Sequence, residues 1–285
     1  MMKVEDEIYG QFEVAPVLKE LINSAPVQRL KNVHQGGAIF LVNPAIKHTR
    51  YEHSIGVLFL VKYFGGGIEE QIAALLHDVS HTAFSHVADY VFENGNEDYH
   101  ETIFNEVISR SEIPLILNKY GFDIATLTCN DYTILERELP DLCADRVDYT
   151  LRDLYHAKLI DKADVQKFLK ELSVQGGYLV VKSEKAGNWI KEQFQRLNDA
   201  YFKKPEHIYA NLQLAQLIKD ALDKKLLQKS DLLCNDFEVL HKLEAHDFGR
   251  QKLNEIKTLT NFKQFSAKGG AERFKQRTLH PSVMI

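Results

Sequence analysis

The fold is decided by the stretch Leu75-Leu76-His77-Asp78-Val79-Ser80-His81-Thr82-Ala83-Phe84-Ser85-His86. It begins at the end of an apolar segment and sets an imidazole directly beside a carboxylate. Neighbouring side chains on an unbroken helix point about 100° apart, so His77 and Asp78 meet one cation only where the helix ends or bends. A single pair of this kind is commonly a solvated helix end. The interpretation as a metal site therefore depends on partners from other segments.

Such partners lie on both sides of the pair. The preceding apolar segment carries His53 and stops at Gly65-Gly66-Gly67, which suits the left-handed conformation wanted after a helix end. Antiparallel packing across this short turn brings His53 alongside His77 and Asp78. A fourth ligand is expected from Asp145, in a helix that begins near residue 141. Two imidazoles and two carboxylates form a mixed set that suits Fe, Mn, Zn or Mg.

Apolar residues recur at helical spacing along most of the chain, as in Val14, Val17, Leu18, Leu21 and Ile22. The sequence therefore predicts an all-α protein with one or two small β-hairpins. Helices are expected over residues 51–64, 68–77, 86–93, 102–109, 141–157, 162–172, 185–202, 208–223 and 231–243. Strands are expected over residues 38–42 and 178–182.

Composition excludes several classes of protein. The hydrophobic fraction of 45% supports a buried core, and the net charge of −5 gives no sequence-wide attraction for nucleic acid or anionic lipid. The longest apolar runs, over residues 38–42 and 57–61, are far shorter than the ~20 residues that span a bilayer. The first residues lack the apolar stretch of a signal peptide. We therefore expect a cytoplasmic protein that binds neither membrane nor nucleic acid.

Five motif blocks stand in an order that resembles the HD-domain metal-dependent phosphohydrolases, and in particular their deoxynucleoside triphosphate triphosphohydrolase branch. The likeness covers roughly residues 5–215 and is most specific between residues 25 and 153. The blocks are Ala25-Pro26-Val27-Gln28-Arg29-Leu30-Lys31, His34-Gln35-Gly36-Gly37, His48-Thr49-Arg50-Tyr51-Glu52-His53-Ser54-Ile55-Gly56, Leu75 to His86 as quoted, and Asp145-Arg146-Val147-Asp148-Tyr149.

The resemblance implies an HD-type helical domain over residues 1–215, with an N-terminal extension, and a helical C-terminal subdomain over residues 216–285 packed on it. It also implies a divalent metal ion of undetermined identity, a small-molecule nucleotide substrate and a homodimer. The tail from Phe248 is rich in Lys and Arg. We interpret it as a solvated subdomain or docking arm, with a nucleic-acid contact as the alternative.

Residue by residue, the resemblance makes His53, His77, Asp78 and Asp145 the metal ligands. It assigns the catalytic positions to His86, Asp89 and His100, with His86 protonating the leaving oxygen and Asp89 orienting it. The expected substrate-binding residues are Gln35, Arg50, His81, Arg146, Tyr149, Asp153 and Lys203. Two of these differ from the family pattern, because Arg146 replaces a lysine and Lys203 an arginine; both replacements keep the charge.

The roles within the substrate set are distinct. Arg50 corresponds to the residue that clamps the phosphate nearest the sugar, and its planar guanidinium suits bidentate phosphate contacts. Gln35 and Asp153 match the pair that reads the sugar hydroxyl, while Tyr149 matches the ring that disfavours a ribose 2′-hydroxyl. His86 and Asp89 are three residues apart, and this spacing places them on one helix face.

The implied reaction is hydrolysis of a deoxynucleoside triphosphate to a deoxynucleoside and triphosphate. Two alternatives stay open. One is a phosphodiesterase or nucleotidase of the same superfamily that acts on cyclic or monophosphorylated nucleotides. The other is a regulatory protein that binds a nucleotide without hydrolysing it. The intact set of metal ligands argues against the second alternative.

Overall fold

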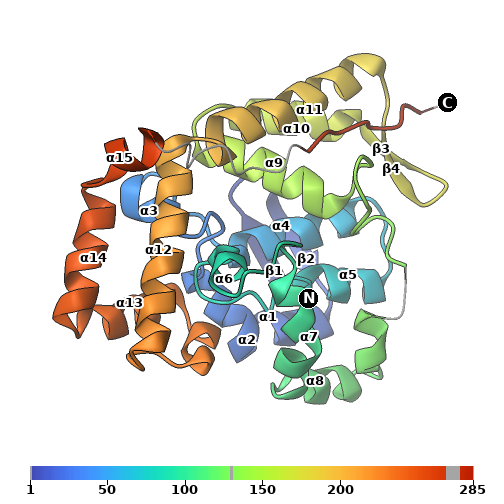
Figure 1. The fold of residues 1–285 in the computed structure, drawn as a ribbon. Helices are drawn as coiled ribbons and strands as arrows, with labels where there is room; N and C mark the ends of the chain where they lie inside the picture. The colour runs from blue at the N-terminus through green and yellow to red at the C-terminus, as the bar shows by residue number, and fades with distance from the viewer. Residues whose placement is uncertain (1, 129–130, 268–276, 285) are drawn as a thin grey trace.

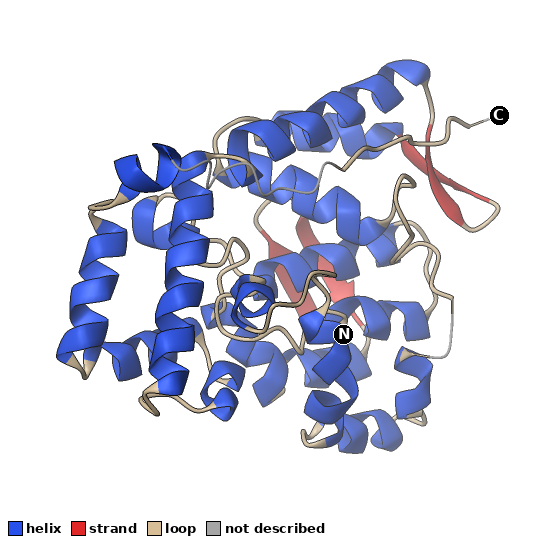
Figure 2. Cartoon of the chain, in the orientation of Figure 1, coloured by secondary structure: helices blue, strands red, loops and turns tan. Residues whose placement is uncertain are grey.

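The computed structural model describes residues 2–128, 131–267 and 277–284. Over these ranges the chain is mainly helical, with two small antiparallel sheets of two strands each (Figure 2). The expectation of an all-α protein with small β-hairpins is thus confirmed. Within the same ranges, no helix is both long and apolar enough to cross a membrane.

The elements fall into three consecutive groups. The first contains β1 (Met2–Asp6), β2 (Gly10–Val14), α1 (Pro16–Ile22), α2 (Ala25–Arg29), the 3-10 turn η1 (Leu30–Asn32), α3 (Ile39–Val42), α4 (Arg50–Tyr63) and α5 (Ile68–Leu76). The second contains α6 (Val87–Val91), α7 (Tyr99–Ser109), α8 (Ile113–Lys119), η2 (Ile124–Leu127), α9 (Ala144–His156), α10 (Lys162–Glu171), β3 (Leu172–Gln175) and β4 (Tyr178–Val181). The third contains α11 (Glu184–Leu197), the π-helical turn η3 (Asn198–Phe202), α12 (Pro205–Asp223), η4 (Lys229–Leu233), α13 (Asp236–Glu244), α14 (Asp247–Lys257) and α15 (Phe262–Ala267).

Helices α4, α5 and α9 form the centre of the molecule (Figure 1). Helix α4 begins with a capping box, in which Thr49 accepts a hydrogen bond from the Glu52 amide while the Glu52 carboxylate accepts one from the Thr49 amide. It ends before Gly65, whose φ of 83° permits the chain to reverse into α5. The predicted antiparallel pair across the glycine turn is therefore present.

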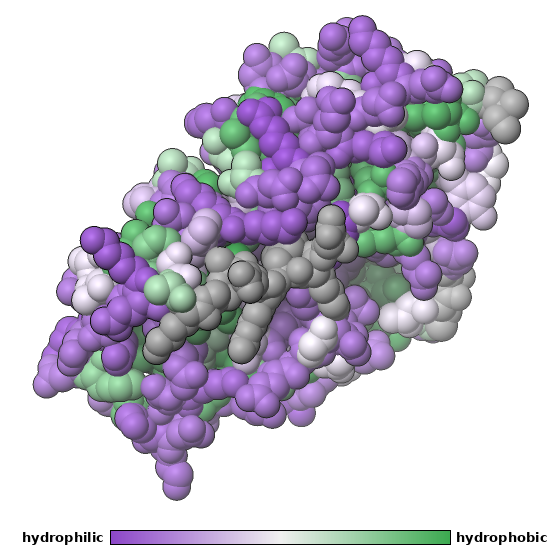
Figure 3. Space-filling model, turned by 45° about the horizontal axis from the view of Figure 1, so that its top comes forward, coloured by the Kyte–Doolittle hydropathy of each residue, from purple (hydrophilic) through white to green (hydrophobic). Residues whose placement is uncertain are grey.

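Three apolar clusters surround this centre. One lies between α4, α9, α10, α11 and the β3–β4 hairpin. A second joins the β1–β2 hairpin to α1, α5 and α8. The third packs α3 and α6 against α12, α13 and α14, which form the group at the left of Figure 1. On the face drawn in Figure 3, hydrophilic side chains predominate and apolar ones are scattered among them.

The strand prediction over residues 38–42 is wrong, because the segment is the short helix α3. A five-residue apolar run does not distinguish a buried strand from a buried helical turn. Here the segment packs on α12, and Ile39 and Leu41 are buried. The other predicted strand is β4, which pairs with β3 through Val181 opposite Leu172.

The proposed division at residue 215 falls inside α12. This helix contacts α3 and α6 from the first part of the chain as well as α14 from the last part. The two parts therefore share a helix and an apolar cluster.

Candidate metal centre and active-site cavity

Three side chains from three elements converge at one point, and a fourth lies beside them. His53 lies in the first turn of α4, His77 and Asp78 directly follow α5, and Asp145 lies in the first turn of α9. The His53 Nε2 atom is 2.9 Å from Asp145 Oδ1, 3.2 Å from His77 Nε2 and 3.5 Å from Asp78 Oδ2. Of the four predicted ligands, His53, His77 and Asp145 thus offer ligand atoms that all lie within 4.8 Å of one another, whereas Asp78 lies beside them, forms a second group with His81 and His100, and accepts a hydrogen bond from Arg50.

The spacing of these atoms fits a shared cation. His77 Nε2 lies 3.6 Å from both Asp78 Oδ1 and Asp145 Oδ1. Ligand atoms at about 2.1 Å from one ion are about 3.0 Å apart at right angles and about 3.4 Å apart in a tetrahedron. The separations among His53, His77 and Asp145, 2.9–3.6 Å, bracket these values, whereas Asp78 approaches His53 through Oδ2 and His77 through Oδ1. The residues present therefore fit a divalent ion with mixed nitrogen and oxygen ligands.

A carboxylate behind His53 fixes the orientation of its ring. Asp148, one turn after Asp145, is fully buried and lies 2.7 Å from His53 Nδ1. The same carboxylate accepts two hydrogen bonds from Arg152, which also donates to Asp6 in β1. A carboxylate on the second ring nitrogen is the usual device for aiming a histidine at a metal. Asp148 was not among the predicted site residues, although it lies inside a quoted motif.

The electrostatic field at this point favours a cation. Burial alone lowers the pKa of His53, but its hydrogen bonds to Asp145 and Asp148 raise the pKa to about 10. Burial raises the pKa of Asp78, but Arg50 and the neighbouring histidines hold this pKa well below its usual value. The carboxylates are therefore ionised and concentrate negative charge around the two imidazoles.

Arg50 joins the metal centre to the next group of residues. It is buried, and it donates from Nη1 to Asp78 Oδ2 at 2.6 Å and from Nε to Ser85 Oγ at 2.9 Å. The arginine expected to hold the phosphate nearest the sugar thus lies beside one candidate metal ligand.

Three further histidines form a cluster next to Asp78. The rings of His81 and His100 stack with centroids 3.8 Å apart, and His86 meets both edge-on. Burial, followed by the charge of Arg50, lowers the pKa of His81 well below its usual value, and burial with His86 lowers that of His100 to about 4. These two rings are therefore neutral near pH 7. His86 is half-exposed and lies 2.9 Å, by Nδ1, from Asp89 Oδ2, as the three-residue spacing predicts.

A single cavity of about 470 Å³ connects these groups. It is lined by eleven of the fourteen predicted site residues: Gln35, Arg50, His77, Asp78, His81, His86, His100, Asp145, Arg146, Tyr149 and Asp153. Of the other three, His53 lies buried behind the lining and Asp89 reaches the cavity through His86. The volume lies within the roughly 300–1,000 Å³ typical of small-molecule sites.

The three residues expected to hold the sugar, Gln35, Tyr149 and Asp153, all line this cavity. Asp153 is buried and accepts a 2.6 Å hydrogen bond from His48 Nε2. The Gln35 Oε1 atom is buried with no hydrogen-bond partner within the described structure. The ring of Tyr149 packs towards Phe194 of α11. These groups provide an unsatisfied acceptor and an aromatic wall. His48, which the sequence analysis did not assign to the site, orients the carboxylate.

Two predicted phosphate-binding cations are engaged elsewhere. Arg146 donates from Nη1 to the Asp141 carbonyl at 2.6 Å and from Nη2 to the Arg137 carbonyl at 3.0 Å. Lys203 lies 3.0 Å from Asp199 and is not part of the cavity lining. The arrangement therefore joins Lys203 to α11 and η3 rather than to the other predicted substrate-binding residues.

A different cation lines the cavity from the C-terminal segment. Arg277 reaches it and pairs with Glu97, and Glu101 and Glu136 also line it. Leu279 is buried in the cluster around α9, and β4 pairs with the same segment through Val181 and Val283. The basic composition of the tail was the only sequence signal for this contact. Of the tail residues, Lys268, Arg273 and Lys275 lie outside the described ranges.

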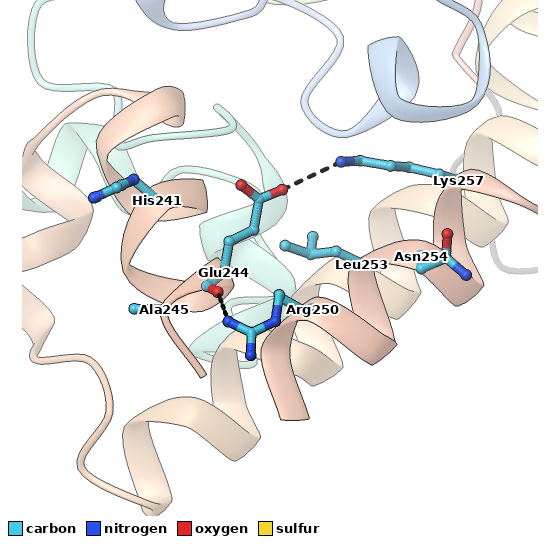
Figure 4. Close-up of a pocket in the computed structure, with 7 residues that line it drawn as sticks. All are labelled: His241, Glu244, Ala245, Arg250, Leu253, Asn254 and Lys257. Atoms are coloured by element: carbon cyan, nitrogen blue, oxygen red, sulfur yellow. Dashed lines mark hydrogen bonds and ion pairs between the residues drawn. The ribbon is translucent and has the colours of Figure 1, made fainter. Parts of the chain in front are cut away.

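A second hollow, of about 500 Å³, lies between α13 and α14 (Figure 4). Its basic side chains are paired locally, with Lys257 Nζ 3.3 Å from Glu244 Oε1 and Arg250 Nη1 2.6 Å from the Glu244 carbonyl. None of the predicted site residues lines it. The cavity at the metal centre is therefore the better candidate for function.

Comparison with known proteins agrees with this geometry. Residues 50–165 match the family model of the HD domain. The uncharacterized protein YdhJ of Bacillus subtilis is 51% identical over 246 residues, which cover 86% of this chain and 76% of YdhJ. The metal-dependent phosphohydrolase cns2 of Cordyceps militaris is 31% identical, covering 90% of this chain and 77% of cns2. The deoxynucleoside triphosphate triphosphohydrolase SAMHD1 of Gallus gallus is 25% identical, covering 79% of this chain and 45% of SAMHD1.

Proposed function

This chain belongs to the HD-domain family of metal-dependent phosphohydrolases, and on that premise we propose that it hydrolyses deoxynucleoside triphosphates to a deoxynucleoside and triphosphate. The observation that carries the proposal is the single cavity lined both by candidate metal ligands and by Gln35, Tyr149 and Asp153. Arg50 and the histidine cluster line the same cavity, and we assign to them the phosphate nearest the sugar of a bound nucleotide. The name of the SAMHD1 relative supports the same substrate class.

His53, His77, Asp78 and Asp145 would hold the divalent ion, which when bound would supply Lewis-acid polarisation of a phosphoryl oxygen and of water. The side chains of the protein bind the phosphate and donate the proton. Arg50, fixed by Asp78 and Ser85, holds the negative charge of the phosphate. The water oxygen bonds to phosphorus and releases one proton to solvent, while the bond from phosphorus to the sugar oxygen breaks. His86 gives a proton to that oxygen, with its Nδ1 held by Asp89 and its Nε2 as the nitrogen that faces the substrate.

The test is a product assay. The purified protein is incubated with Mn²⁺, Fe²⁺ or Mg²⁺ and, in turn, with deoxynucleoside triphosphates, nucleoside triphosphates, monophosphates and cyclic nucleotides. The proposal predicts inorganic triphosphate and free deoxynucleoside from the first group, with slower release from ribonucleotides because of Tyr149. It is contradicted if no deoxynucleoside triphosphate yields triphosphate with any of the three metals.

A second candidate is a nucleotidase for nucleoside monophosphates, and a specific observation favours it. Arg146 is bound to backbone carbonyls, Lys203 lies outside the lining, and three glutamates line the cavity. Such a lining offers fewer cations to outer phosphates than the resemblance implies. In the same assay this function gives orthophosphate from monophosphates and no triphosphate.

We also propose that the chain forms a homodimer and binds one kind of divalent metal. The resemblance implies a homodimer, which sedimentation of the purified chain tests directly. The native metal is identified by elemental analysis of protein purified without added metal. A protein that contains only a redox-inert metal agrees with either proposed hydrolysis, since neither reaction needs electron transfer.

A further inference from the structure

A buried carboxylate in the C-terminal part of the chain contacts the active-site loops. Asp236, in the first turn of α13, is fully buried. Its Oδ2 atom accepts a 2.9 Å hydrogen bond from the His34 amide and lies 2.7 Å from His34 Nδ1. Its Oδ1 atom accepts a 2.6 Å hydrogen bond from the Phe84 amide. A carboxylate withdrawn from water needs such partners, and these lie in two segments that flank the catalytic cavity.

The segment before α13 contacts the same loop. The Ala83 amide donates to the Leu232 carbonyl at 2.8 Å. Arg29, which is partly buried, donates from Nη2 to the carbonyls of Val79 and His81 and from Nη1 to that of Cys234. Residues 232–236, here called the clasp, contact the loop of residues 79–85 directly through Leu232 and Asp236. Cys234 contacts the same loop indirectly, through Arg29.

The held loop has an unusual backbone. Phe84 and Ser85 have φ values of 60° and 53°, in the left-handed region that is unfavourable for residues with a Cβ atom. Two such residues in succession persist only where surrounding contacts fix them. The hydrogen bond from the Phe84 amide to Asp236 is such a contact, and it lies at the start of the strained turn.

The turn delivers one hydroxyl group to Arg50. Ser85 Oγ donates to the His34 carbonyl at 2.7 Å and accepts from Arg50 Nε at 2.9 Å. Asp236 thus fixes both neighbours of this hydroxyl, since one oxygen holds His34 and the other holds Phe84. Arg50 in turn donates to Asp78. All six residues of this series are buried, so the hydrogen bonds are not in competition with solvent.

We propose that Asp236 is a positioning residue for Arg50, acting through His34 and the strained Phe84–Ser85 turn. The C-terminal part of the chain therefore completes the active site from behind the cavity, although it supplies through the clasp no group that lines it. The proposal rests on the proposed function only in taking Arg50 as the residue that holds the reacting phosphate.

The main test compares Asp236→Asn with Ser85→Gly. An Asn side chain offers one acceptor, so it satisfies either His34 or Phe84 but not both. Ser85→Gly removes the hydroxyl and its two hydrogen bonds, and because glycine tolerates the positive φ, relief of backbone strain offsets part of that loss of stability. We expect both to lower kcat/KM at least about tenfold, mainly through kcat, with metal content unchanged. A melting temperature that holds or rises in Ser85→Gly while kcat falls separates positioning from general stability.

The double variant tests whether the two residues act in series. If Asp236 works through Ser85, then Asp236→Asn costs little further activity once Ser85→Gly is present. Independent, additive losses would overturn the proposal. Wild-type kcat/KM in Ser85→Gly would also overturn it. The matched control is Asp231→Asn, which removes a carboxylate from η4 that pairs with Lys242 and lies away from the cavity, and which leaves kcat/KM unchanged.

A spectroscopic measurement keeps this proposal separate from the identity of the substrate. In the full-length protein labelled with ¹⁵N-arginine, the Nε–H signal of Arg50 is assigned by its loss in Arg50→Lys. We expect this signal to shift and exchange faster with water in Asp236→Asn and in Ser85→Gly, and to stay unchanged in Asp231→Asn. An unchanged signal in Asp236→Asn contradicts the positioning role even if the protein hydrolyses no nucleotide in the assay above.

Discussion

At the scale of single residues, the chemistry of the site depends on pairs that aim one group at another. His53 faces Asp148 with one ring nitrogen and the candidate metal position with the other. Arg50 is held by Asp78 on one side and Ser85 on the other. His86 is held by Asp89. Each functional side chain is thus oriented by a second side chain, usually from another element.

Loss of a metal ligand has a direct consequence. We expect His77→Ala to abolish both bound metal and turnover, because the three remaining ligands leave an incomplete set. Elemental analysis and the product assay measure the two effects on the same sample. His241→Ala, which removes a histidine from α13 far from the centre, is the control. Turnover by metal-free His77→Ala protein would refute the metal-dependent mechanism.

Asp148→Asn tests the residue behind His53. Outer-shell partners of this kind typically change metal affinity about 10–100-fold, and we expect a loss in that range. Asp6→Asn is a matched control, since Asp6 also pairs with Arg152 but does not touch His53. Metal titration of both variants decides the matter. Equal losses of affinity in the two would mean that the Arg152 network, and not the His53 contact, is responsible.

The candidate metal ligands and the proton donor could be proposed from the sequence because the residue types themselves, histidine and aspartate, indicate that chemistry. The four ligand candidates and the His86–Asp89 pair lie where the spacing and the resemblance place them. Apart from Asp89, the sequence did not predict the residues that orient these side chains without lining the cavity. Asp148 lies in the motif around Asp145, where a second carboxylate one turn later was a usable signal. Asp236 follows Ser85 by some 150 positions, and no local pattern connects them.

At the scale of elements, the site exists because α4 and α9 approach closely. Gly56 lies on the face of α4 that meets α9, and a Cβ atom there would clash with Asp148 and Arg152. A glycine in the middle of a helix lowers helix propensity, but here it leaves the space that the buried Asp148–Arg152 pair occupies. The approach also brings His53 and Asp145, one from the first turn of each helix, to the same point.

Gly56→Ala tests this approach. In an open helix position, Gly→Ala stabilises by up to about 1 kcal/mol. Here we expect the opposite sign, a loss of roughly 1–3 kcal/mol in the free energy of unfolding, because the buried pair must move. Gly187→Ala in α11 is the control, since a Cβ atom there meets Val181 at an ordinary 3.4 Å. Chemical denaturation of both variants gives the two signs; a stabilised Gly56→Ala would contradict this packing.

The elements show where sequence patterns are sufficient. Long helices such as α4, α5 and α12 follow from periodicity and from glycine turns. Short apolar runs do not decide between helix and strand, as α3 shows. The β1–β2 hairpin carries little apolar alternation beyond Val4 and Val14, and its position depends on packing against α1 and α5.

At the scale of the whole molecule, two separate segments of the chain's C-terminal third contribute to the cavity. The clasp supports it from behind, and Arg277 lines it from the segment that returns beside β4 (Figure 1). Neither contact was predicted, because both join residues that are distant in sequence. The resemblance to the family is concentrated before residue 153 and gave no guide to this part of the chain.

Ending the chain after residue 276 tests the contribution of the returning segment. It removes the buried Leu279 and the pairing with Val181, so we expect the melting temperature to fall by several degrees. Arg277→Gln separates the charge from the packing. Its pair with Glu97 is about one-third exposed, so this variant keeps the melting temperature while KM rises. Arg250→Gln on α14 is the control, and an unchanged KM in Arg277→Gln would exclude a substrate contact.

The central claim is that four side chains from α4, the end of α5 and α9 hold one divalent ion. The most direct measurement is a crystal structure of the protein with Mn²⁺, with anomalous data collected at the manganese edge. We expect one strong anomalous peak within about 2.0–2.4 Å of His53 Nε2, His77 Nε2 and a carboxylate oxygen of both Asp78 and Asp145. A manganese peak only at another position, or an ion at this position that Asp145 does not contact, would contradict the four-ligand site.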